Sequence, residues 1–408
     1  MTTFANLNNQ PAVQFDGTND FLNIPASVIQ GKTAFTFFTA FQWNGGSAWQ
    51  RLWDFGSNTT TNGFVTTSNG GTSTPRFAIT TSGSGGEEQL TFSSALPTVS
   101  GQVLDVVWGL RNGASEASGS AYTLSPASLG SITQHYMGKS IDAANPYLNT
   151  TIGDYIIFSS ALNDTEHILV ENYLSAKYNV ALSANDVYNG DDALNGDFDL
   201  DVAGIGQYGG NQHTQAHAAG MIVADRNFLH DDGDWLLFGH NVAANTHVTT
   251  DLPTSGDWAT AASPQRWARA FYINVTDNTT GTDCTTPGTC FVDIIFDFSE
   301  GGMGAPLPAG PVSNYRLLKR TGASGQFSDI ATATAIVGDQ VQFLGVDVSL
   351  LGSNFTLGTL DSGTSPTAVT LKAFQAHARG SLTAWLLVAL GAILFGIPYL
   401  AVKRIQRH

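Results

Sequence analysis

The sequence predicts an all-β protein with two sandwich-like domains, one helix that closes the first domain, and a single C-terminal transmembrane helix. Strand-like runs recur about every ten residues, the spacing typical of sandwiches. The 408 residues include 44 glycines, and small polar residues suited to turns separate the runs. The domains expected are a first sandwich at 1–181, a second β-rich domain at 182–360, a linker at 361–383, the spanning helix at 384–402 and a basic tail at 403–408.

Strand candidates fill most of the first 160 residues. Val13–Phe15 leads into a turn rich in Asp, Gly and Asn, and Phe21–Pro25 follows it. These runs are short and bounded by turn residues, so they predict a sandwich or jelly roll. The further candidates are Ala34–Gln42, Arg51–Phe55, Gly63–Thr67, Arg76–Thr80, Gln89–Phe92, Val103–Leu110 and Thr151–Phe158.

One clear helix follows the last of these strands. Asn163 can cap its N-terminus, and Glu166, three residues later, can complete a capping box. The apolar residues after it recur at helical spacing and form one stripe, so the helix should pack on the first sandwich and close it. The stripe consists of Ile168, Leu169, Tyr173, Leu174 and Tyr178.

Two segments that bracket the first domain resemble a known family. Phe15–Pro25 (FDGTNDFLNIP) and Ile152–Val180, which ends in YLSAKYNV, are similar to the laminin-G-like, concanavalin-A-like jelly roll of bacterial surface proteins. The resemblance implies that the first segment is an early strand and that the second is a strand followed by a short helix.

The second half resembles a domain of unknown function that often follows laminin-G-like modules in large bacterial exported proteins. The resemblance implies an adhesin-like surface protein and supplies no ligand. By composition alone this half is also β-rich, with strand-like runs at 291–298, 315–320, 341–348 and 354–360. The segments that carry the resemblance are Tyr188–Gln207, Gly220–Asn241, Arg266–Val275 and Phe355–Thr359.

The apolar run Ala384–Val402 predicts a membrane anchor. As a helix it would be roughly 28 Å long, close to the hydrocarbon thickness of a bilayer. Lys403, Arg404 and Arg407 follow it and favour a cytoplasmic C-terminus, so the preceding domains should face outward at the cell surface. A buried terminal helix and a sorting tail removed during surface attachment are the alternatives. The net charge of −16 argues against nucleic acid and anionic lipid as partners.

The two cysteines predict a disulfide. Cys284 and Cys290 enclose the sequence TTPGT, whose Pro-Gly pair can fold the chain back between two strands. No third or fourth ligand lies nearby in the sequence, which argues against a metal site. A disulfide is also typical of an oxidising compartment.

Alternating acidic residues open the second domain. Asp197, Asp199 and Asp201 alternate with apolar residues, which on a strand would place three carboxylates on one face. With Asp191 upstream, the carboxylates form a candidate structural calcium site, since calcium prefers oxygen ligands. A solvated acidic face is the alternative. No other cofactor is expected.

The histidines and a second acidic turn predict no chemistry. His213 and His217 are four residues apart, but HTQAH lacks the glutamate of a zinc hydrolase motif and follows a Gly-Gly pair, which indicates a loop. His240 is expected to be a hydrogen-bonding turn residue. Turn chemistry also accounts for the aspartates at 231–234.

Two tryptophans flank a Gly-Gly loop in the first domain. Trp43 and Trp49 could stack on sugar rings if exposed, although packing in a core or at an edge is the more frequent use of tryptophan. They are the candidate ligand-binding residues of the chain.

No motif of a known catalytic class is present. Residues 1–181 lack an alternating acidic strand that could supply the paired carboxylates of a polysaccharide hydrolase. There is also no GxSxG elbow, P-loop or GxGxxG fingerprint in a strand–helix context. We therefore expect a non-enzymatic cell-surface protein, adhesin-like or an envelope structural component, whose partners are the membrane, an extracellular glycan or protein surface, or further copies of itself. A glycan-binding lectin-like module is the alternative, and a polysaccharide hydrolase ranks third.

Overall fold

The computed structural model describes residues 2–367, apart from residues 71–72, 107–108, 120–121, 243–244, 304–306 and 323. Within this part of the chain, no helix is long and apolar enough to cross a membrane. The expected spanning helix, Ala384–Val402, and the basic tail lie outside the described residues, as does most of the expected linker.

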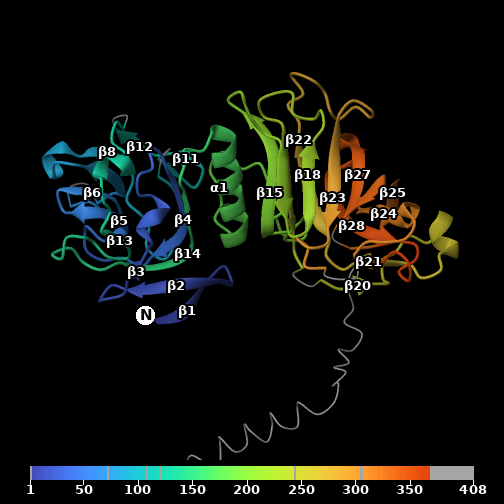
Figure 1. Ribbon diagram of the computed structural model, residues 1–408, viewed down its shortest axis with the longest axis horizontal. Helices are drawn as coiled ribbons and strands as arrows, with labels where there is room; N and C mark the ends of the chain where they lie inside the picture. The colour runs from blue at the N-terminus through green and yellow to red at the C-terminus, as the bar shows by residue number, and fades with distance from the viewer. Residues whose placement is uncertain are drawn as a thin grey trace, which may run out of the picture. The chain divides into compact units, whose positions relative to one another are not determined.

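The first half forms a β-sandwich of two seven-stranded antiparallel sheets, sheet A and sheet B (Figure 1). Neighbouring strands are often distant in sequence: β14 lies between β2 and β4, so the chain crosses repeatedly from one sheet to the other. In order, sheet A contains β1 (Thr2–Leu7), β2 (Gln10–Asp16), β14 (Asn149–Phe158), β4 (Thr36–Trp43), β9 (Gly101–Asp105), β10 (Leu110–Arg111) and β11 (Ala114–Ser115). Sheet B contains β12 (Ala117–Gly119), β8 (Glu88–Phe92), β7 (Arg76–Thr80), β6 (Thr61–Thr66), β5 (Arg51–Asn58), β13 (Gln134–Met137) and β3 (Leu22–Asn23).

An aromatic core fills the space between sheets A and B. Phe37 and Phe41 of β4 meet Trp53 and Phe55 of β5, and all four are fully buried. These residues alternate along their strands with residues on the opposite face of each sheet, such as Phe38 and Asp54, which are also buried. The predicted β-sandwich is therefore confirmed. The run Val103–Leu110, expected to be one strand, is divided between β9 and β10.

Helix α1 (Asp164–Tyr178) is the only α-helix in the described part of the chain, and it begins where the sequence predicts. The Asn163 side chain accepts the N–H of Glu166 at 3.1 Å, and the Glu166 carboxylate accepts the N–H of Asn163 at 3.0 Å. This reciprocal capping box satisfies two N–H groups that would otherwise lack partners. At the other end, Asn179 adopts the left-handed conformation, with φ of 50°, and terminates the helix.

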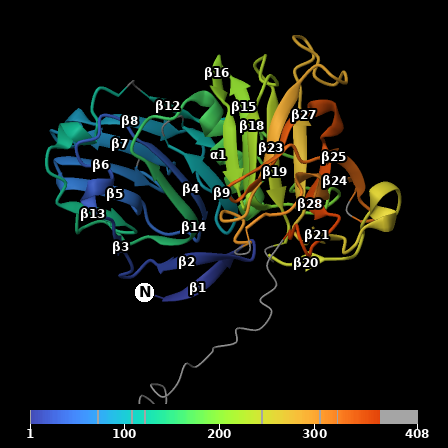
Figure 2. The same ribbon diagram turned by 45° about the vertical axis from the view of Figure 1, so that its right-hand side comes forward.

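Both sides of α1 are buried, whereas the sequence predicts one apolar stripe on the first sandwich. Leu174 and Tyr178 pack with residues of sheet A. Ile168 and Ala176 pack instead with Val202 and other buried residues of the second half. The helix thus contributes to two cores, and Figures 1 and 2 show it beside β4 and β15 (Leu200–Tyr208).

The second half forms another antiparallel sandwich, built from sheets C and D. In order, sheet C contains β16 (Asn211–His213), β15, β19 (Trp235–His240), β22 (Phe271–Thr276), β28 (Ser353–Thr359), β21 (Gln265–Trp267) and β20 (His247–Val248), with β24 (Tyr315–Arg320) paired to β28 and to β25 (Ser328–Thr332). Sheet D contains β17 (Gln215–Ala218), β18 (Met221–Asp225), β23 (Phe291–Asp297), β27 (Gln340–Asp347) and β26 (Ala335–Val337). The short 3-10 helices of the two halves are Ala26–Val28, Ser84–Gly86, Pro126–Leu129, Gly256–Thr260, Val312–Asn314 and Val348–Leu350.

The predicted disulfide is confirmed. Cys284 and Cys290 are bonded, with their Cα atoms 5.1 Å apart, and both are fully buried in the core of the second sandwich. The bond closes the loop that leads into β23.

The first residues of the expected linker are packed on the second sandwich. The Tyr315 hydroxyl donates to the Pro366 carbonyl at 2.9 Å, and the Asn314 side chain donates to Ser365 at 3.0 Å. Ser365 and Thr367 are fully buried. The ordered second domain therefore continues beyond residue 360, because the side chains of Asn314 and of Tyr315, the first residue of β24, bond the segment that follows β28.

Candidate ligand pocket on sheet B

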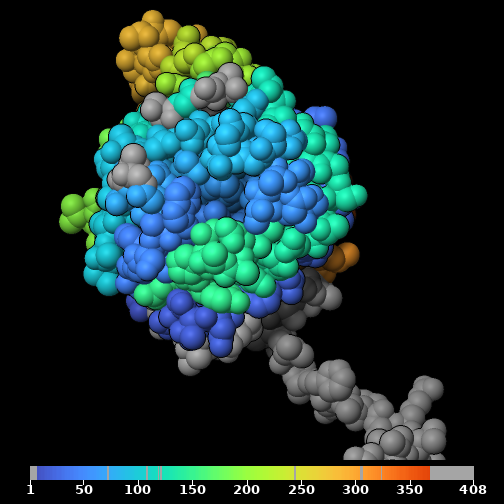
Figure 3. Space-filling view, turned by 90° about the vertical axis from the view of Figure 1, so that its left-hand side faces the viewer, coloured from blue at the N-terminus to red at the C-terminus, as the bar shows by residue number. Residues whose placement is uncertain are grey.

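A polar pocket of about 660 Å³ opens on sheet B of the first sandwich. On β6, the core-facing Val65 alternates with Asn62 and Phe64, which line the pocket on the opposite face of the sheet. Figure 3 faces this side of the molecule and shows a hollow among the blue atoms near its centre, with green atoms below it. Its lining includes Trp49, Arg51, Asn62, Phe64, Arg76, Glu87 and Asp142.

The Arg51 guanidinium forms one wall of the pocket. Its Nε donates to the Asp54 carboxylate at 3.3 Å, and its Nη1 donates to the Trp49 carbonyl at 2.8 Å. The side chains of Arg51 and Asp54 are 6% and 0% exposed, respectively. Burial lowers the pKa of Arg51, while Asp54 opposes this change. A buried ion pair of this kind is stable only when further hydrogen bonds satisfy its remaining atoms.

The Asp54 carboxylate, which lies behind the pocket, accepts such further hydrogen bonds. In addition to Arg51, its carboxylate accepts the Asn62 amide at 3.2 Å, the Ser140 hydroxyl at 3.0 Å and the Ile141 backbone N–H at 3.0 Å. Burial raises the pKa of Asp54, and Arg51 and these donors oppose the rise. Asp54 thus joins β5, β6 and the loop after residue 139, which form three sides of the pocket.

Two aromatic rings are stacked with the arginines. The Arg51 guanidinium lies 4.1 Å from the centre of the Phe64 ring, and the Arg76 guanidinium lies 5.0 Å from that of Trp49. Trp49 has a positive φ of 72°, and its backbone N–H donates to the Ser68 carbonyl at 2.7 Å. A Cβ atom on Gly70 would lie 2.7 Å from the Trp49 indole nitrogen, so the indole requires glycine at this position. The ring is therefore held in place before any ligand arrives.

Arg76 is paired on the other side of the pocket. Its Nη2 lies 3.0 Å from the Glu87 carboxylate, and its Nη1 donates to the Gln89 side chain at 2.9 Å. Burial lowers the pKa of Arg76, and Glu87 opposes this change. Within the described residues, the buried Nε of Arg76 has no hydrogen-bond partner.

The structure separates the two tryptophans that the sequence places together. Trp49 lines the pocket, whereas Trp43 does not. The Trp43 indole donates to the Gln50 side chain at 2.9 Å and packs against the aromatic core. Of the two candidate ligand residues, only Trp49 is therefore placed to meet a ligand in this pocket.

The acidic residues predicted to share one strand face are not on one strand. Strand β15 begins at Leu200, and Asp197 and Asp201 have positive φ angles of 59° and 51°. This backbone turns the chain and breaks the alternation, so the prediction of one strand face is wrong. Asp201 instead accepts a hydrogen bond from His240 at 2.8 Å.

Asp191, Asp197 and Asp199 remain together and line a smaller polar pocket with Asn8 and Asn179. Burial raises the pKa of Asp191 to about 6, and Asp186, Asp192 and Asp197 add to the rise. Burial and then Asp197 also raise the pKa of Asp199. In the described ranges, no group of three or more His, Cys, Asp or Glu residues is arranged to hold a metal ion, so the expected calcium site has no support in the structure.

The histidines lie in strands, where the sequence predicted loop positions. Gly209 and Gly210 form the turn between β15 and β16, so His213 ends β16 and His217 lies in β17. His217 pairs with Glu300 at 3.0 Å on the surface. His240 ends β19, and its second ring nitrogen lies 3.1 Å from the Val242 carbonyl. Turn chemistry is confirmed at Asp234, which accepts the N–H groups of His230 and Asp231.

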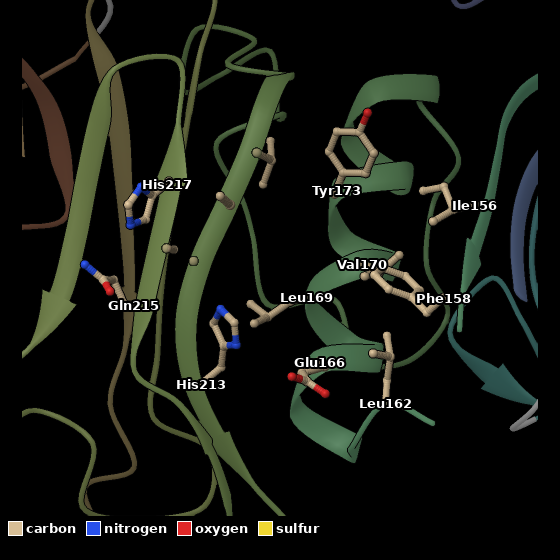
Figure 4. A pocket seen from close by; sticks show the side chains of 14 residues that line it. Ile156, Phe158, Leu162, Glu166, Leu169, Val170, Tyr173, His213, Gln215 and His217 are labelled. Atoms are coloured by element: carbon tan, nitrogen blue, oxygen red, sulfur yellow. The ribbon is translucent and has the colours of Figure 1, made fainter. Parts of the chain in front are cut away.

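An apolar groove of about 400 Å³ lies between α1 and the β15–β17 region. Figure 4 shows side chains of α1 and β14 opposite β15, with His213 beside Leu169. Its polar lining residues are Glu166, His213, Gln215 and His217, of which Glu166 is bonded in the capping box and His217 is paired with Glu300. We therefore regard the pocket on sheet B as the better candidate site.

Helix α1 carries a buried carboxylate with few partners, Glu171. Glu171 is fully buried, and neither of its carboxylate oxygens forms a hydrogen bond with the described residues. Burial raises its pKa to about 8; Asp105 adds to the rise, and the Gly113 amide opposes it. His167, on the same helix, bonds Asp105.

Sequence reasoning missed Arg51, Asp54, Asn62 and Arg76. The available signal was the presence of charged and amide residues within strongly apolar strand runs. A buried charge requires a partner, so such a residue points to a polar network. The partners come from separate strands, and the sequence alone does not reveal their pairing.

Comparisons with known proteins leave the family of this chain open. No family model matches it, and no curated protein matches it. The laminin-G-like resemblance therefore stays a prediction beyond the β-sandwich architecture itself.

Several solved structures are weakly similar to the chain. The enzymatically active domain of tailspike protein 2 of bacteriophage CBA120 is 14% identical with a TM-score of 0.26, and the match covers 45% of this chain and 33% of that one. A botulinum neurotoxin type C structure, described for its interaction with two ganglioside molecules, is 12% identical with a TM-score of 0.29, covering 85% and 91%. NanB sialidase from Streptococcus pneumoniae is 11% identical with a TM-score of 0.26, covering 77% and 49%. Likeness at this level carries no argument about function.

Proposed function

We propose that this protein is a lectin-like binding module of a cell-surface protein and that the pocket on sheet B holds a carbohydrate. The single observation that supports this proposal is the placement of Trp49 beside the buried network of Arg51, Asp54 and Asn62. It favours the lectin-like alternative over a purely structural envelope component.

The pocket combines the two features that sugar recognition needs. Aromatic side chains provide apolar surface for the C–H face of a sugar ring, and a few fixed polar groups orient its hydroxyls. Trp49 is held by its backbone hydrogen bond to Ser68, and Asn62 is held by Asp54. Because these groups are ordered before binding, less conformational entropy is lost when a ligand is bound.

We propose that binding is not followed by turnover. The carboxylate of Asp54, directly behind the pocket, accepts hydrogen bonds from four groups, and Glu87 is paired with Arg76. Groups committed in this way are poorly suited to transferring protons. Turnover of a polysaccharide by the purified protein would contradict this part of the proposal.

Display at the cell surface is the second element of the proposal. The disulfide is typical of an oxidising compartment, and the run Ala384–Val402 has the composition of a membrane anchor. Fractionation of intact cells and protease treatment from outside test this element. Recovery in the soluble fraction together with full protection from protease would contradict it.

A glycan array followed by calorimetry on the best ligand tests the carbohydrate proposal. Asparagine tolerates a positive φ, so Trp49→Asn removes the indole without adding backbone strain. We expect this variant to lose at least tenfold in affinity. Tyr208→Ala, which removes an exposed aromatic residue on the second sandwich, is the control and should bind normally. Equal binding by Trp49→Asn and wild type would place the site elsewhere.

A further inference from the structure

Every cationic group in the sheet B pocket already has an anionic partner. Arg51 lies 3.3 Å from Asp54, and Arg76 lies 3.0 Å from Glu87. Asp142, an exposed residue, adds a further carboxylate to the wall. The pocket therefore has no unpaired positive charge with which to neutralise an anionic ligand.

Both arginines are also hydrogen-bonded to protein oxygens. Arg51 uses Nε and Nη1 on protein oxygens, and Arg76 uses both terminal nitrogens on Glu87 and Gln89. The guanidinium groups lie over Phe64 and Trp49, within 4.1 Å and 5.0 Å of the ring centres. Bidentate recognition of a carboxylate, sulfate or phosphate needs two parallel N–H donors from one guanidinium. In each arginine, two of the three nitrogens are already bonded to protein oxygens, so neither guanidinium has two wholly unengaged nitrogens for such a pair.

The remaining polar groups suit hydroxyls. The Asn62 amide nitrogen donates to Asp54, and its side-chain oxygen bonds no group in the described part of the chain. Asp142 accepts hydrogen bonds only, while the hydroxyls of Ser82 and Ser84 can both donate and accept. A sugar hydroxyl also donates and accepts, so it can satisfy such a mixed set of groups.

The net charge of the whole chain also disfavours anionic ligands. With a net charge of −16, the protein repels anionic ligands at long range and lowers their rate of encounter. This repulsion weakens as salt is added, because salt screens exposed charges. It does not affect uncharged ligands.

We infer that the pocket selects uncharged sugars over acidic ones, an inference that rests on the proposed carbohydrate-binding function. The ligand class is a neutral oligosaccharide, and sugars carrying a carboxylate or a sulfate are excluded. The selectivity against acidic sugars arises because Arg51 is already paired with Asp54 and Arg76 with Glu87.

Calorimetry on the full chain with matched sugars tests the inference. Neutral oligosaccharides are compared with the same backbones carrying a carboxylate or a sulfate, at 50 and 300 mM salt. We expect the neutral sugars to bind at least tenfold more tightly, with little dependence on salt. Tighter binding of the acidic sugars, weakened by salt, would overturn the inference and leave the proposed function standing. Binding of no sugar of either class would overturn both.

A charge-neutralising variant sharpens the test. Glu87→Gln leaves Arg76 without its anionic partner, so affinity for the acidic sugars should rise at least fivefold. Glu300→Gln makes the same charge change on the second sandwich, where Glu300 pairs with the exposed His217, and should leave both affinities unchanged. Circular dichroism confirms that both variants fold. An equal rise in both variants would show that overall charge, and not the pairing of Arg76, governs selectivity.

Discussion

The pocket on sheet B and the acidic cluster at residues 191–199 are both rich in charged groups, yet they differ in how those charges are paired. In the pocket, Arg51 and Asp54 are almost completely buried and each has several partners. In the cluster, Asp191 and Asp199 face other carboxylates, and their pKa values are raised. The charges of the first region are paired within the protein, whereas the second region is a set of mutually repelling groups.

This difference shows that acidic residues close together in sequence do not by themselves make a site. The DxDxD segment stands out in the sequence, but among the described residues no group of three or more acidic or histidine side chains is arranged to hold a metal ion, and Asp201 bonds His240 instead. The pocket residues are scattered over β5, β6 and β7, and they meet only because these strands are neighbours in sheet B. Four variants test this contrast.

Removing the central carboxylate of the pocket should have the largest effect. Asp54→Ala leaves the Arg51 guanidinium buried without its anion, which costs about 3–5 kcal/mol of the free energy of unfolding. Thermal and urea denaturation measure the change. Asp142→Asn, at an exposed residue of the same pocket, should change stability by less than about 0.5 kcal/mol. A loss below 1 kcal/mol in Asp54→Ala would show that the network is not a stabilising element.

Glu171 tests what a buried carboxylate costs when it lacks good partners. Its pKa is about 8 in the folded chain, so the folded state holds a proton that the unfolded state releases near pH 4.5. Stability should therefore fall as pH rises through this range, and Glu171→Gln should remove roughly 3 kcal/mol of that fall. Melting curves from pH 5 to 8.5 measure the difference between variant and wild type. Parallel pH profiles would refute this account, and Glu300→Gln is the control.

Asp191 should show a smaller effect of the same sign. Its pKa is about 6, so its carboxylate destabilises the folded state as pH rises from about 4 through 6. Asp191→Asn should stabilise the protein by about 1 kcal/mol at pH 8, a value reduced because Asp191 is partly open to solvent. The gain should shrink as pH falls through 6 and vanish only below the unfolded value of 3.8, where melting temperatures of variant and wild type should coincide. A loss of stability at pH 8 would show that the carboxylate has a favourable partner.

Asp201 should show the smallest effect. The hydrogen bond from His240 lowers its pKa, so its contribution is present above about pH 4 and is lost as pH falls below that value. Its side chain is 61% exposed, and exposed pairs contribute little. Asp201→Asn, which tolerates the positive φ at this position, should change stability by less than about 0.5 kcal/mol at pH 7. A larger loss in urea denaturation would show that the pair is structural.

Local features were predictable because they depend on neighbouring residues. The helix and its capping box at Asn163 follow from side-chain chemistry within four residues, and the disulfide follows from the five-residue loop between the two cysteines. Strands such as Arg76–Thr80 follow from short apolar runs bounded by turn residues. The sequence by itself therefore determined the all-β class and most strand positions of the first sandwich.

Pairings between distant residues were decided only by the tertiary structure. Ser140 reaches Asp54 across 86 positions of sequence, and α1 is buried against β15 as well as sheet A, which one apolar stripe does not reveal. The positive φ angles at Asp197 and Asp201 likewise override a strand-like alternation. Burial and hydrogen bonding depend on which strands become neighbours, and local periodicity carries no information about that choice.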